Sequence, residues 1–229
     1  MLRIVGLWVL LVFCGSVLAG GFAVVPLRAE LGKNRSSSLT VTNTEEAKTF
    51  EVRAVSWKQK NREDSYAKSD DLLLAPATFK LEKGASQVVR IQLNRKLDGD
   101  EHVYRVFIDE VPPAAEVRAN SLKTVVSMAI PVFVAPASGP VAKGQLEMKA
   151  SLAKNVVNIE LRNTGKANLK LREWVLSSTK GELHKVPSAA YVLTGNTMTG
   201  DYPLTIQADG PLKLTVLTDR GSFSADVKR

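Results

Sequence analysis

The sequence predicts an all-β protein built from two sandwich domains, and three observations support this. After the first twenty residues, apolar and polar residues alternate with a period of two, as in strands that bury one face. Gly, Pro, Asn and Asp turn signals separate these stretches, and no amphipathic helix of appreciable length is apparent. At 229 residues, the chain is too long for one immunoglobulin-sized sandwich and suits two of about 100 residues each.

The predicted strands are spread over both halves of the chain. In the first half they are Ser38–Asn43, Phe50–Trp57, Ser86–Leu93 and Val103–Val111, and in the second half they are 145–152, 155–163, 169–176, 212–219 and 221–229. Between the halves, Ala135–Gly144 is rich in Pro, Gly and Ala and is the best linker candidate. We therefore expect domains at residues 21–137 and 143–229.

The first twenty residues have the pattern of a secretory signal peptide. Arg3 supplies a positive charge, Ile4–Cys14 is apolar but shorter than a membrane-spanning helix, and Ala19 is a small residue before a cleavage site. The expected mature N-terminus is Gly20 or Gly21. Cys14 is the only cysteine and would be removed with the leader, which excludes disulfides and thiol chemistry in the mature chain.

Composition and motifs give little support for catalysis or nucleic-acid binding. The formal net charge is +8, but the basic residues are scattered, which indicates a solvated surface. His102 and His184 fall in different predicted domains, and no HExxH, phosphate-binding or GxSxG motif occurs. Asp109 and Glu110 are adjacent on a strand and point to opposite faces, while the Asp70–Asp71 pair is expected in a solvated loop. We expect no enzyme, cofactor or metal site.

One segment, Thr124–Pro136, is more apolar than its neighbours. A sandwich strand with one face in water should alternate, but TVVSMAIPVFVAP has apolar residues on both faces. It is either a strand covered by the neighbouring domain at the linker or an edge strand that offers itself to a partner. Long apolar edges are normally avoided because they aggregate. The pattern alone leaves both alternatives open.

Five segments together resemble the periplasmic chaperones of chaperone–usher pilus assembly, over nearly all of the mature chain. They are PLRAEL with SLTVTN, APATFKLEKGASQVVRI at Ala75–Ile91, YRVFIDEVPP at Tyr104–Pro113, IPVFVAP at Ile130–Pro136 and TGDYPL at Thr199–Leu204. The resemblance implies two immunoglobulin-like domains set as a boomerang. It also implies a periplasmic chaperone that lends its last domain-one strand to pilin subunits and delivers them to an outer-membrane usher. It leaves open whether the free protein caps itself as a homodimer.

The resemblance also implies site residues. The donor side chains would be Leu122, Thr124, Val126 and Met128, which share one face of a strand, with Lys123 on the other face.

The subunit's terminal carboxylate would be anchored by Arg28. The family's usual second anchor, a Lys, falls on Pro131, so Arg105 is the expected substitute.

Glu101 and Asp201 match acidic members of an interdomain ion network, but its Arg position is Ala135, which predicts a looser hinge or one held in another way. The main alternative function is a secreted immunoglobulin-like adhesion or binding module, and a β-sandwich enzyme is a weaker one.

Overall fold

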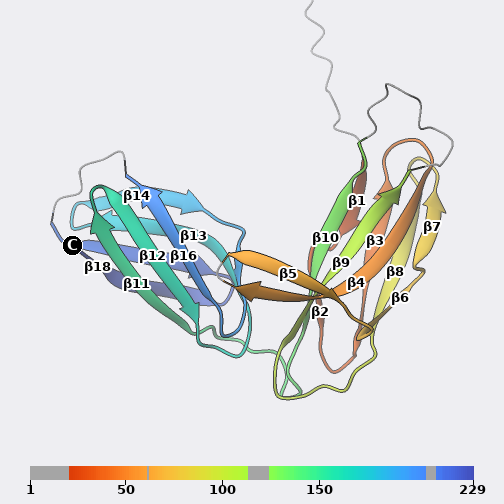
Figure 1. Cartoon of the computed structure of the whole chain (residues 1–229), viewed down its shortest axis with the longest axis horizontal. Coiled ribbons are helices and arrows are strands. Elements are labelled where there is room, and N and C mark those ends of the chain that lie inside the picture. The colour runs from red at the N-terminus through yellow and green to blue at the C-terminus, as the bar shows by residue number, and fades with distance from the viewer. Residues whose placement is uncertain (1–20, 61, 113–123, 205–209) are drawn as a thin grey trace, which may run out of the picture.

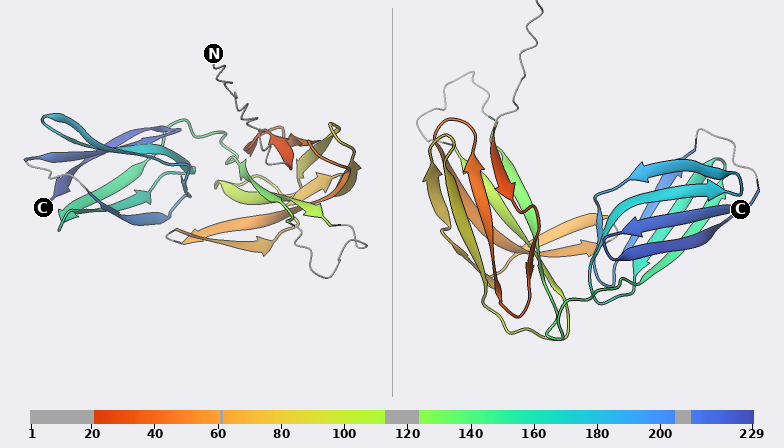
Figure 2. Two further views of the ribbon diagram at one scale, coloured as in Figure 1. Left: turned by 90° about the horizontal axis from the view of Figure 1, so that it is seen from above. Right: turned by 180° about the vertical axis from the view of Figure 1, so that it is seen from behind.

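The structure is a computed structural model that describes residues 21–60, 62–112, 124–204 and 210–229. In this part of the chain all regular structure is β-strand, arranged in two domains that meet at an angle (Figures 1 and 2). The strands of the first domain lie between Phe22 and Val134, and those of the second between Leu146 and Lys228. The predicted all-β, two-domain boomerang is confirmed. The expected leader, residues 1–20, lies outside the described residues.

The first domain consists of two sheets. The four-stranded sheet has the order β1-β3-β8-β6, formed by β1 Phe22–Val25, β3 Ser36–Asn43, β8 Ser86–Leu93 and β6 Leu72–Ala75. The six-stranded sheet has the order β2-β10-β9-β4-β5 with β7 also paired to β4, formed by β2 Ala29–Leu31, β10 Ser127–Val134, β9 His102–Val111, β4 Lys48–Lys60, β5 Glu63–Lys68 and β7 Thr78–Leu81. Together they form a sandwich.

The core of the first domain lies between these two sheets. Leu39 and Ile91 from one sheet and Phe50, Ile108 and Val132 from the other belong to one cluster of buried side chains. Each fully buried side chain of this size stabilises the fold by about 1.5–3 kcal/mol. In these strands the period-two pattern of the sequence places the apolar face inward, as predicted.

The chain crosses from one sheet to the other between β1 and β2. β1 pairs antiparallel with β3, whereas β2 pairs parallel with β10. Pro26 lies in the crossing and has no backbone N–H to give to a ladder. The break leaves Arg28 immediately before β2.

The two edges of β10 are paired over different lengths. Its antiparallel ladder with β9 runs from Ser127 to Val134, whereas its parallel ladder with β2 begins only at Val132. The Glu110 N–H donates to the Val126 carbonyl at 3.0 Å. Because such bonds alternate along an antiparallel pair, the N–H and C=O groups of Ser127 and Ala129 point to the other edge. Among the described residues, no strand pairs with that edge before Val132.

The position of Pro131 is explained by this half-paired edge. It has the same parity as Ser127 and Ala129, so its nitrogen faces the edge that lacks a partner. Proline is tolerated in sheets where its missing N–H would face such an edge. The absence of a cation at this position is therefore compatible with an intact strand.

Thr124–Pro136 combines the two alternatives that the sequence left open. Toward its end, Ile130, Val132 and Val134 lie in the core of the first domain, while Phe133 packs in a cluster at the second domain. Toward its start, Val125 is 50% exposed and the strand edge is unpaired. The later half is a buried strand at the linker, and the earlier half is an open edge.

The second domain is one eight-stranded sheet that folds over on itself. Its order is β14-β13-β17-β18-β11-β12-β16 with β15 also paired to β13, and its strands are β11 Leu146–Ala153, β12 Val156–Asn163, β13 Leu169–Ser178, β14 Gly181–Pro187, β15 Tyr191–Val192, β16 Thr197–Pro203, β17 Leu212–Thr218 and β18 Gly221–Lys228. Ile159 on β12 and Trp174 and Val216 on β13 and β17 share one buried cluster, so opposite parts of the sheet face each other.

The β4–β5 hairpin links the two domains. β4 is 13 residues long, and with β5 it projects from the first domain toward the second (Figure 1). All six residues of β5 are exposed. The hairpin brings Trp57 and Gln59, near the end of β4, to the second domain.

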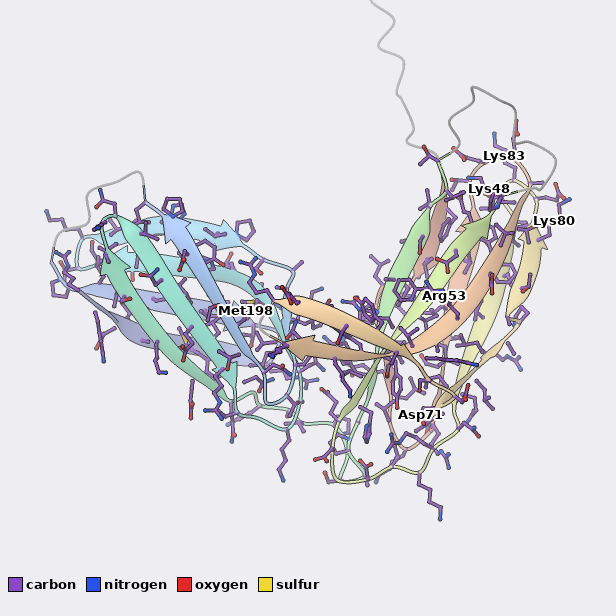
Figure 3. The ribbon with its side chains drawn as sticks, viewed as in Figure 1. Lys48, Arg53, Asp71, Lys80, Lys83 and Met198 are labelled. Carbon is purple, nitrogen blue, oxygen red and sulfur yellow. The ribbon has the colours of Figure 1, made fainter. Side chains whose placement is uncertain are left out.

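Asp71 lies in the loop just before β6 (Figure 3), as the sequence predicted, and its side chain is 37% exposed, but it is also bonded to neighbouring residues. It accepts a hydrogen bond from the hydroxyl of Tyr104 on β9 at 2.7 Å and an ion pair from Arg95 at 3.4 Å. Burial and this bond raise the pKa of Tyr104 to about 12. Burial works against ionisation of Asp71, but the hydrogen bond from Tyr104 and the charge of Arg95 outweigh it and lower the pKa of that carboxyl.

Tyr104→Phe should destabilise the first domain by about 1 kcal/mol at neutral pH, less than a fully buried charged hydrogen bond because the Asp71 side chain is 37% exposed. Because the folded pKa of Asp71 is lowered, its contribution is present above the unfolded value of about 3.9 and is lost as pH falls through the folded value. The variant should therefore lose less stability than the wild type on acidification. Denaturant unfolding across this pH range measures it.

The control is Tyr66→Phe, which removes an exposed hydroxyl bonded to Asp64 at 3.3 Å and should change stability little. Equal effects of the two substitutions would contradict the role given to the Tyr104–Asp71 bond.

Candidate functional site in the interdomain cleft

An aromatic cluster joins the two domains at the base of the cleft. Trp57 and Phe133 come from the first domain and Tyr191 and Leu193 from the second. The ring of Tyr191 lies 5.8 Å from that of Trp57 and 5.3 Å from that of Phe133, centroid to centroid. Burial of these rings and their edge or tilted contacts stabilise one domain against the other. We call these four residues the cleft cluster.

Arg28 lies on one side of the cleft cluster. Its guanidinium is 4.5 Å from the ring centre of Phe133 and 5.7 Å from that of Tyr191. It forms ion pairs with Glu30 at 2.7 Å and, across the domain boundary, with Asp219 at 2.8 Å. The side chains of Arg28 and Asp219 are only 20% and 18% exposed. Arg28 is therefore already paired with two carboxylates in this structure.

Arg105 lies over another ring of the cleft cluster. Its guanidinium is 3.9 Å from the ring centre of Trp57, and its side chain is 16% exposed. Its polar contacts are long: 3.7 Å to the Asp64 carboxylate and 3.4 Å to the Ala129 carbonyl. Arg105 pairs with Pro131 in the ladder between β9 and β10. The expected substitute cation is thus next to the proline that replaces the usual Lys, and its charge is weakly neutralised.

Three hydrogen-bond donors around the cleft cluster are underused. The Nε atoms of Arg28 and Arg105 and the indole nitrogen of Trp57 are buried, and no acceptor for them occurs among the described residues. A buried donor without an acceptor costs roughly 1–3 kcal/mol. Such groups are rare and call for an explanation in terms of strain or function. The Nε atoms of Arg35 and Arg95, away from the cleft, are in the same state, so it is these donors together with the two stacked cations that mark the cleft as the candidate site.

Glu101 is an interdomain residue, as expected, although its partner is not an arginine on the last strand. Its two carboxylate oxygens accept from the backbone N–H and the side-chain amide of Asn168 at 2.7 and 2.8 Å. Arg220 donates to the Asn168 carbonyl at 3.0 Å and to the carbonyl of Val141 in the linker. Burial raises the pKa of Glu101, against the opposing effects of the Asn168 bonds and the charges of Arg220 and Arg28.

Gln59 adds a further clasp between the domains. Its side-chain amide donates to the Tyr191 carbonyl at 3.0 Å and accepts from the Leu193 N–H at 3.1 Å. The Gln59 side chain therefore bonds to the backbone of β15 and of the residue that follows it, as a neighbouring strand would. Together with the contacts of Glu101 and Arg28, the Gln59 side chain holds the two domains together, although the position where the family has an arginine is Ala135 here.

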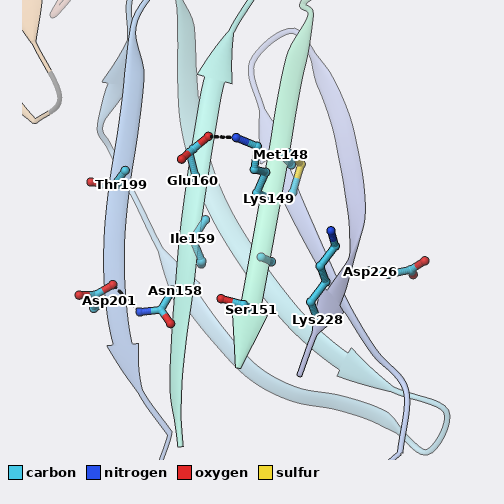
Figure 4. Close-up of a pocket in the computed structure, with 11 residues that line it drawn as sticks. Met148, Lys149, Ser151, Asn158, Ile159, Glu160, Thr199, Asp201, Asp226 and Lys228 are labelled. Atoms are coloured by element: carbon cyan, nitrogen blue, oxygen red, sulfur yellow. Dashed lines mark hydrogen bonds and ion pairs between the residues drawn. The ribbon is translucent and has the colours of Figure 1, made fainter. Parts of the chain in front are cut away.

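Asp201 does not take part in these interdomain contacts, which corrects the expectation for it. It lies on β16 and accepts a hydrogen bond from Asn158 on β12 at 2.7 Å (Figure 4). Both line a hollow of about 570 Å³ on the second domain, away from the cleft cluster. The acidic residue that reaches across from the second domain is Asp219, in the turn between β17 and β18.

The expected donor residues fall at the open start of β10. Met128 packs against the core of the first domain, and Thr124 and Val126 continue the same parity beyond the strand's assigned start. Val126 is partly buried, whereas Thr124 is exposed. Leu122 and Lys123 lie outside the described residues. At the start of β10, the side chains that continue the core face of the first domain therefore lie beside an edge that has no strand partner among the described residues.

Residues 29–140 match the family model for the pili and flagellar-assembly chaperone, PapD N-terminal domain. The match covers the first domain, which belongs to this family of pilus-assembly chaperones. The family is one of chaperones rather than enzymes, and the match disfavours the alternative of an adhesion module without a chaperone role. A sequence search of curated proteins finds no match.

Solved structures of pilus chaperones share this two-domain fold. The chain is similar to a structure of the CsuC–CsuE chaperone–tip adhesion subunit complex of Acinetobacter baumannii, with 18% identity, a TM-score of 0.64, and 91% of this chain and 99% of that chain covered. The Salmonella enterica SafA pilin–SafB chaperone structure gives 17% identity, a TM-score of 0.61, and coverage of 90% and 96%. The Escherichia coli chaperone DraB gives 22%, 0.59, 91% and 97%.

Two further features of the chaperone concern metals and membranes. The residues that the structure describes contain no group of three or more His, Cys, Asp or Glu arranged to hold a metal ion. No helix among them is long and apolar enough to cross a membrane.

Several cleft residues of the chaperone were not found from the sequence. Asp219 is separated from Arg28 by 191 positions, and no motif links them. Gln59 and Asn168 are polar residues next to predicted strands, without a pattern that distinguishes them. Trp57 had a weak signal, since it is a large aromatic residue at the end of a strand.

Glu101→Gln should change how stability depends on pH. Because the folded pKa of Glu101 is raised, its contribution is fully present below the unfolded value of about 4.3 and is lost as pH rises through the folded value. A glutamine cannot ionise and cannot accept both Asn168 bonds, so the variant should be less stable by about 1 kcal/mol near the unfolded pKa. This deficit should shrink toward neutral pH in thermal unfolding, and a deficit that grows with pH would contradict the account.

Proposed function

We propose that this protein is a periplasmic chaperone that binds pilin subunits by donating the open edge of β10, and that it delivers them to an outer-membrane usher. One observation carries the proposal: the half-paired edge of β10 adjoins a row of side chains that continues the domain's own core face. In keeping with this, two of the similar structures contain a chaperone together with a subunit.

The chemistry of binding is β-strand addition. A pilin that lacks its last strand exposes apolar core, at a cost of roughly 25 cal/mol per Å². The N–H groups of Ser127 and Ala129 face an edge that has no strand partner among the described residues, and their pairing with an added strand supplies affinity. Leu122, Thr124, Val126 and Met128 fill the subunit's groove with their side chains. The subunit's burial of its core supplies the driving force, so no nucleotide or metal is needed.

The subunit's C-terminal carboxylate is bound in the cleft by Arg105 and Arg28. Arg105 stacks on Trp57 and has only long polar contacts. It can therefore donate two hydrogen bonds to a carboxylate without first losing a strong partner. Arg28 is presented from the other side of the cleft cluster. The guanidinium fork matches a carboxylate better than an ammonium does, which favours arginine at a site where Pro131 replaces the usual Lys.

Location and assembly belong to the same proposal. The leader at residues 1–20 directs the chain to the periplasm and is cleaved before Gly20 or Gly21. In the absence of pilin, the open edge of β10 needs protection from aggregation. A homodimer in which two copies cover each other's edges would provide it.

Val126→Asp should abolish pilin capture, because it would place an unpaired carboxylate among the subunit's apolar side chains. Val125→Asp is the matched control: the same change at the neighbouring position, whose side chain faces away and is 50% exposed, should leave capture largely intact. Copurification of pilin from the periplasm with each variant measures this.

Both variants must give the wild-type circular dichroism spectrum. Loss of capture in Val125→Asp together with normal capture in Val126→Asp would mean that the opposite face of the strand enters the groove. Normal capture in both would refute strand donation.

Arg105→Ala should leave the protein folded and reduce the amount of copurified pilin by at least tenfold, since a desolvated charge-assisted pair contributes about 1.5–3 kcal/mol. Arg105→Lys should recover only part of the binding, because an ammonium cannot bind both oxygens in one plane. Wild-type capture by Arg105→Ala would exclude this residue as an anchor.

A further inference from the structure

The two ion pairs that Arg28 already forms conflict with direct binding of the subunit's terminal carboxylate. The two terminal nitrogens of Arg28 bind the carboxylates of Glu30 and Asp219, so one positive charge faces two negative charges. A third carboxylate would meet repulsion from both at close range. If Arg28 binds the subunit's terminal carboxylate, at least one of the present partners must leave.

The Asp219 carboxylate is well placed to leave without a large penalty. The other carboxylate oxygen of Asp219, Oδ1, accepts a hydrogen bond from the backbone N–H of Lys170 at 2.9 Å. The backbone N–H of Asp219 donates to the Lys170 carbonyl at 3.0 Å. These bonds lie within the second domain and do not depend on Arg28. After losing Arg28, the carboxylate would therefore keep one hydrogen bond and partial access to solvent.

Arg28 is likewise held in place without its carboxylates. The guanidinium lies over Phe133 and near Tyr191, and this stacking does not use its N–H groups. An exchange of one carboxylate for another would therefore leave the cation in position.

We propose that Asp219, with Glu30, holds the place of the subunit's terminal carboxylate on Arg28 until a subunit binds. The incoming carboxylate displaces Asp219, and subunit binding thereby opens the Arg28–Asp219 contact between the domains. This inference rests on the proposed function and adds to it a coupling: the cleft is closed by an internal carboxylate when empty and loosened when filled. The remaining interdomain contacts, through Gln59 and Glu101, keep the domains together.

The test compares Asp219→Asn with Glu30→Gln. Each chaperone variant is co-expressed with the wild-type chaperone under a different tag, together with the pilin that copurifies with the wild type, and the shares of captured pilin give relative affinities. Asp219→Asn should take roughly tenfold more pilin than the wild type, because it no longer competes for Arg28. Glu30→Gln should gain about two- to threefold, because the Glu30 side chain is 56% exposed and its pair is screened.

A second readout follows the domains directly. Spin labels on cysteines introduced at the exposed Lys80 and Lys149 report the distance between domains, because the mature chain without its leader has no cysteine of its own. The free Asp219→Asn variant should show a broader distance distribution than the free wild type, and the wild type with pilin should broaden in the same way. Glu30→Gln, which breaks no interdomain contact, should not broaden.

The outcomes separate the two levels of the proposal. A wild-type or smaller share of pilin for Asp219→Asn would overturn the exchange, and so would an unchanged distance distribution in the pilin complex. In either case capture by the wild type would still support the proposed function. Failure of the wild type to capture any pilin would instead count against the proposed function itself.

Discussion

The unequal pairing of β10 is the constraint on which the rest of the structure depends. Along one edge this strand is bonded to β9 over its whole length, and along the other it meets β2 only from Val132 onward. Full pairing would give an ordinary closed sandwich, and no pairing would leave the strand unsupported. With half of the edge paired, the later half of the strand is fixed in place by the core. The earlier half still exposes backbone groups along its open edge.

The same strand also sets the geometry of the cleft. Its paired half carries Phe133 into the cleft cluster, where aromatic residues of both domains meet. Arg28 precedes the strand that pairs with this half, and Arg105 lies opposite Pro131 on the neighbouring strand. Because both cations stack on rings of one cluster, the positions of the cations and the angle between the domains are linked. A change in the packing at the domain boundary therefore shifts the positions of Arg28 and Arg105.

Strands that bury one face were predictable from the sequence, and contacts between distant segments were not. The alternation in Ser86–Leu93 predicts the bounds of β8, because Val89, Ile91 and Leu93 at every second position lie in the core. β5 escaped prediction because all of its residues are exposed and it owes its place to pairing with β4.

The site was predictable in part for the same reason. Arg28, Arg105 and Glu101 are at the cleft, as their places in recognisable segments suggested. Asp201 was chosen from the segment TGDYPL, most of which lies in β16, away from the cleft. Asp219 could not be found, since only the fold brings the last turn of the second domain beside the first strands of the chain.

Residue-specific hydrogen exchange of β10, with and without bound pilin, tests strand donation most directly. The N–H groups of Ser127 and Ala129 face the open edge, whereas those of Met128 and Ile130 face β9. The account predicts that pilin strongly slows exchange at Ser127 and Ala129, while Met128 and Ile130, already bonded to β9, change much less. Unchanged exchange at Ser127 and Ala129 in a complex that has formed would contradict the claim that this edge receives the subunit.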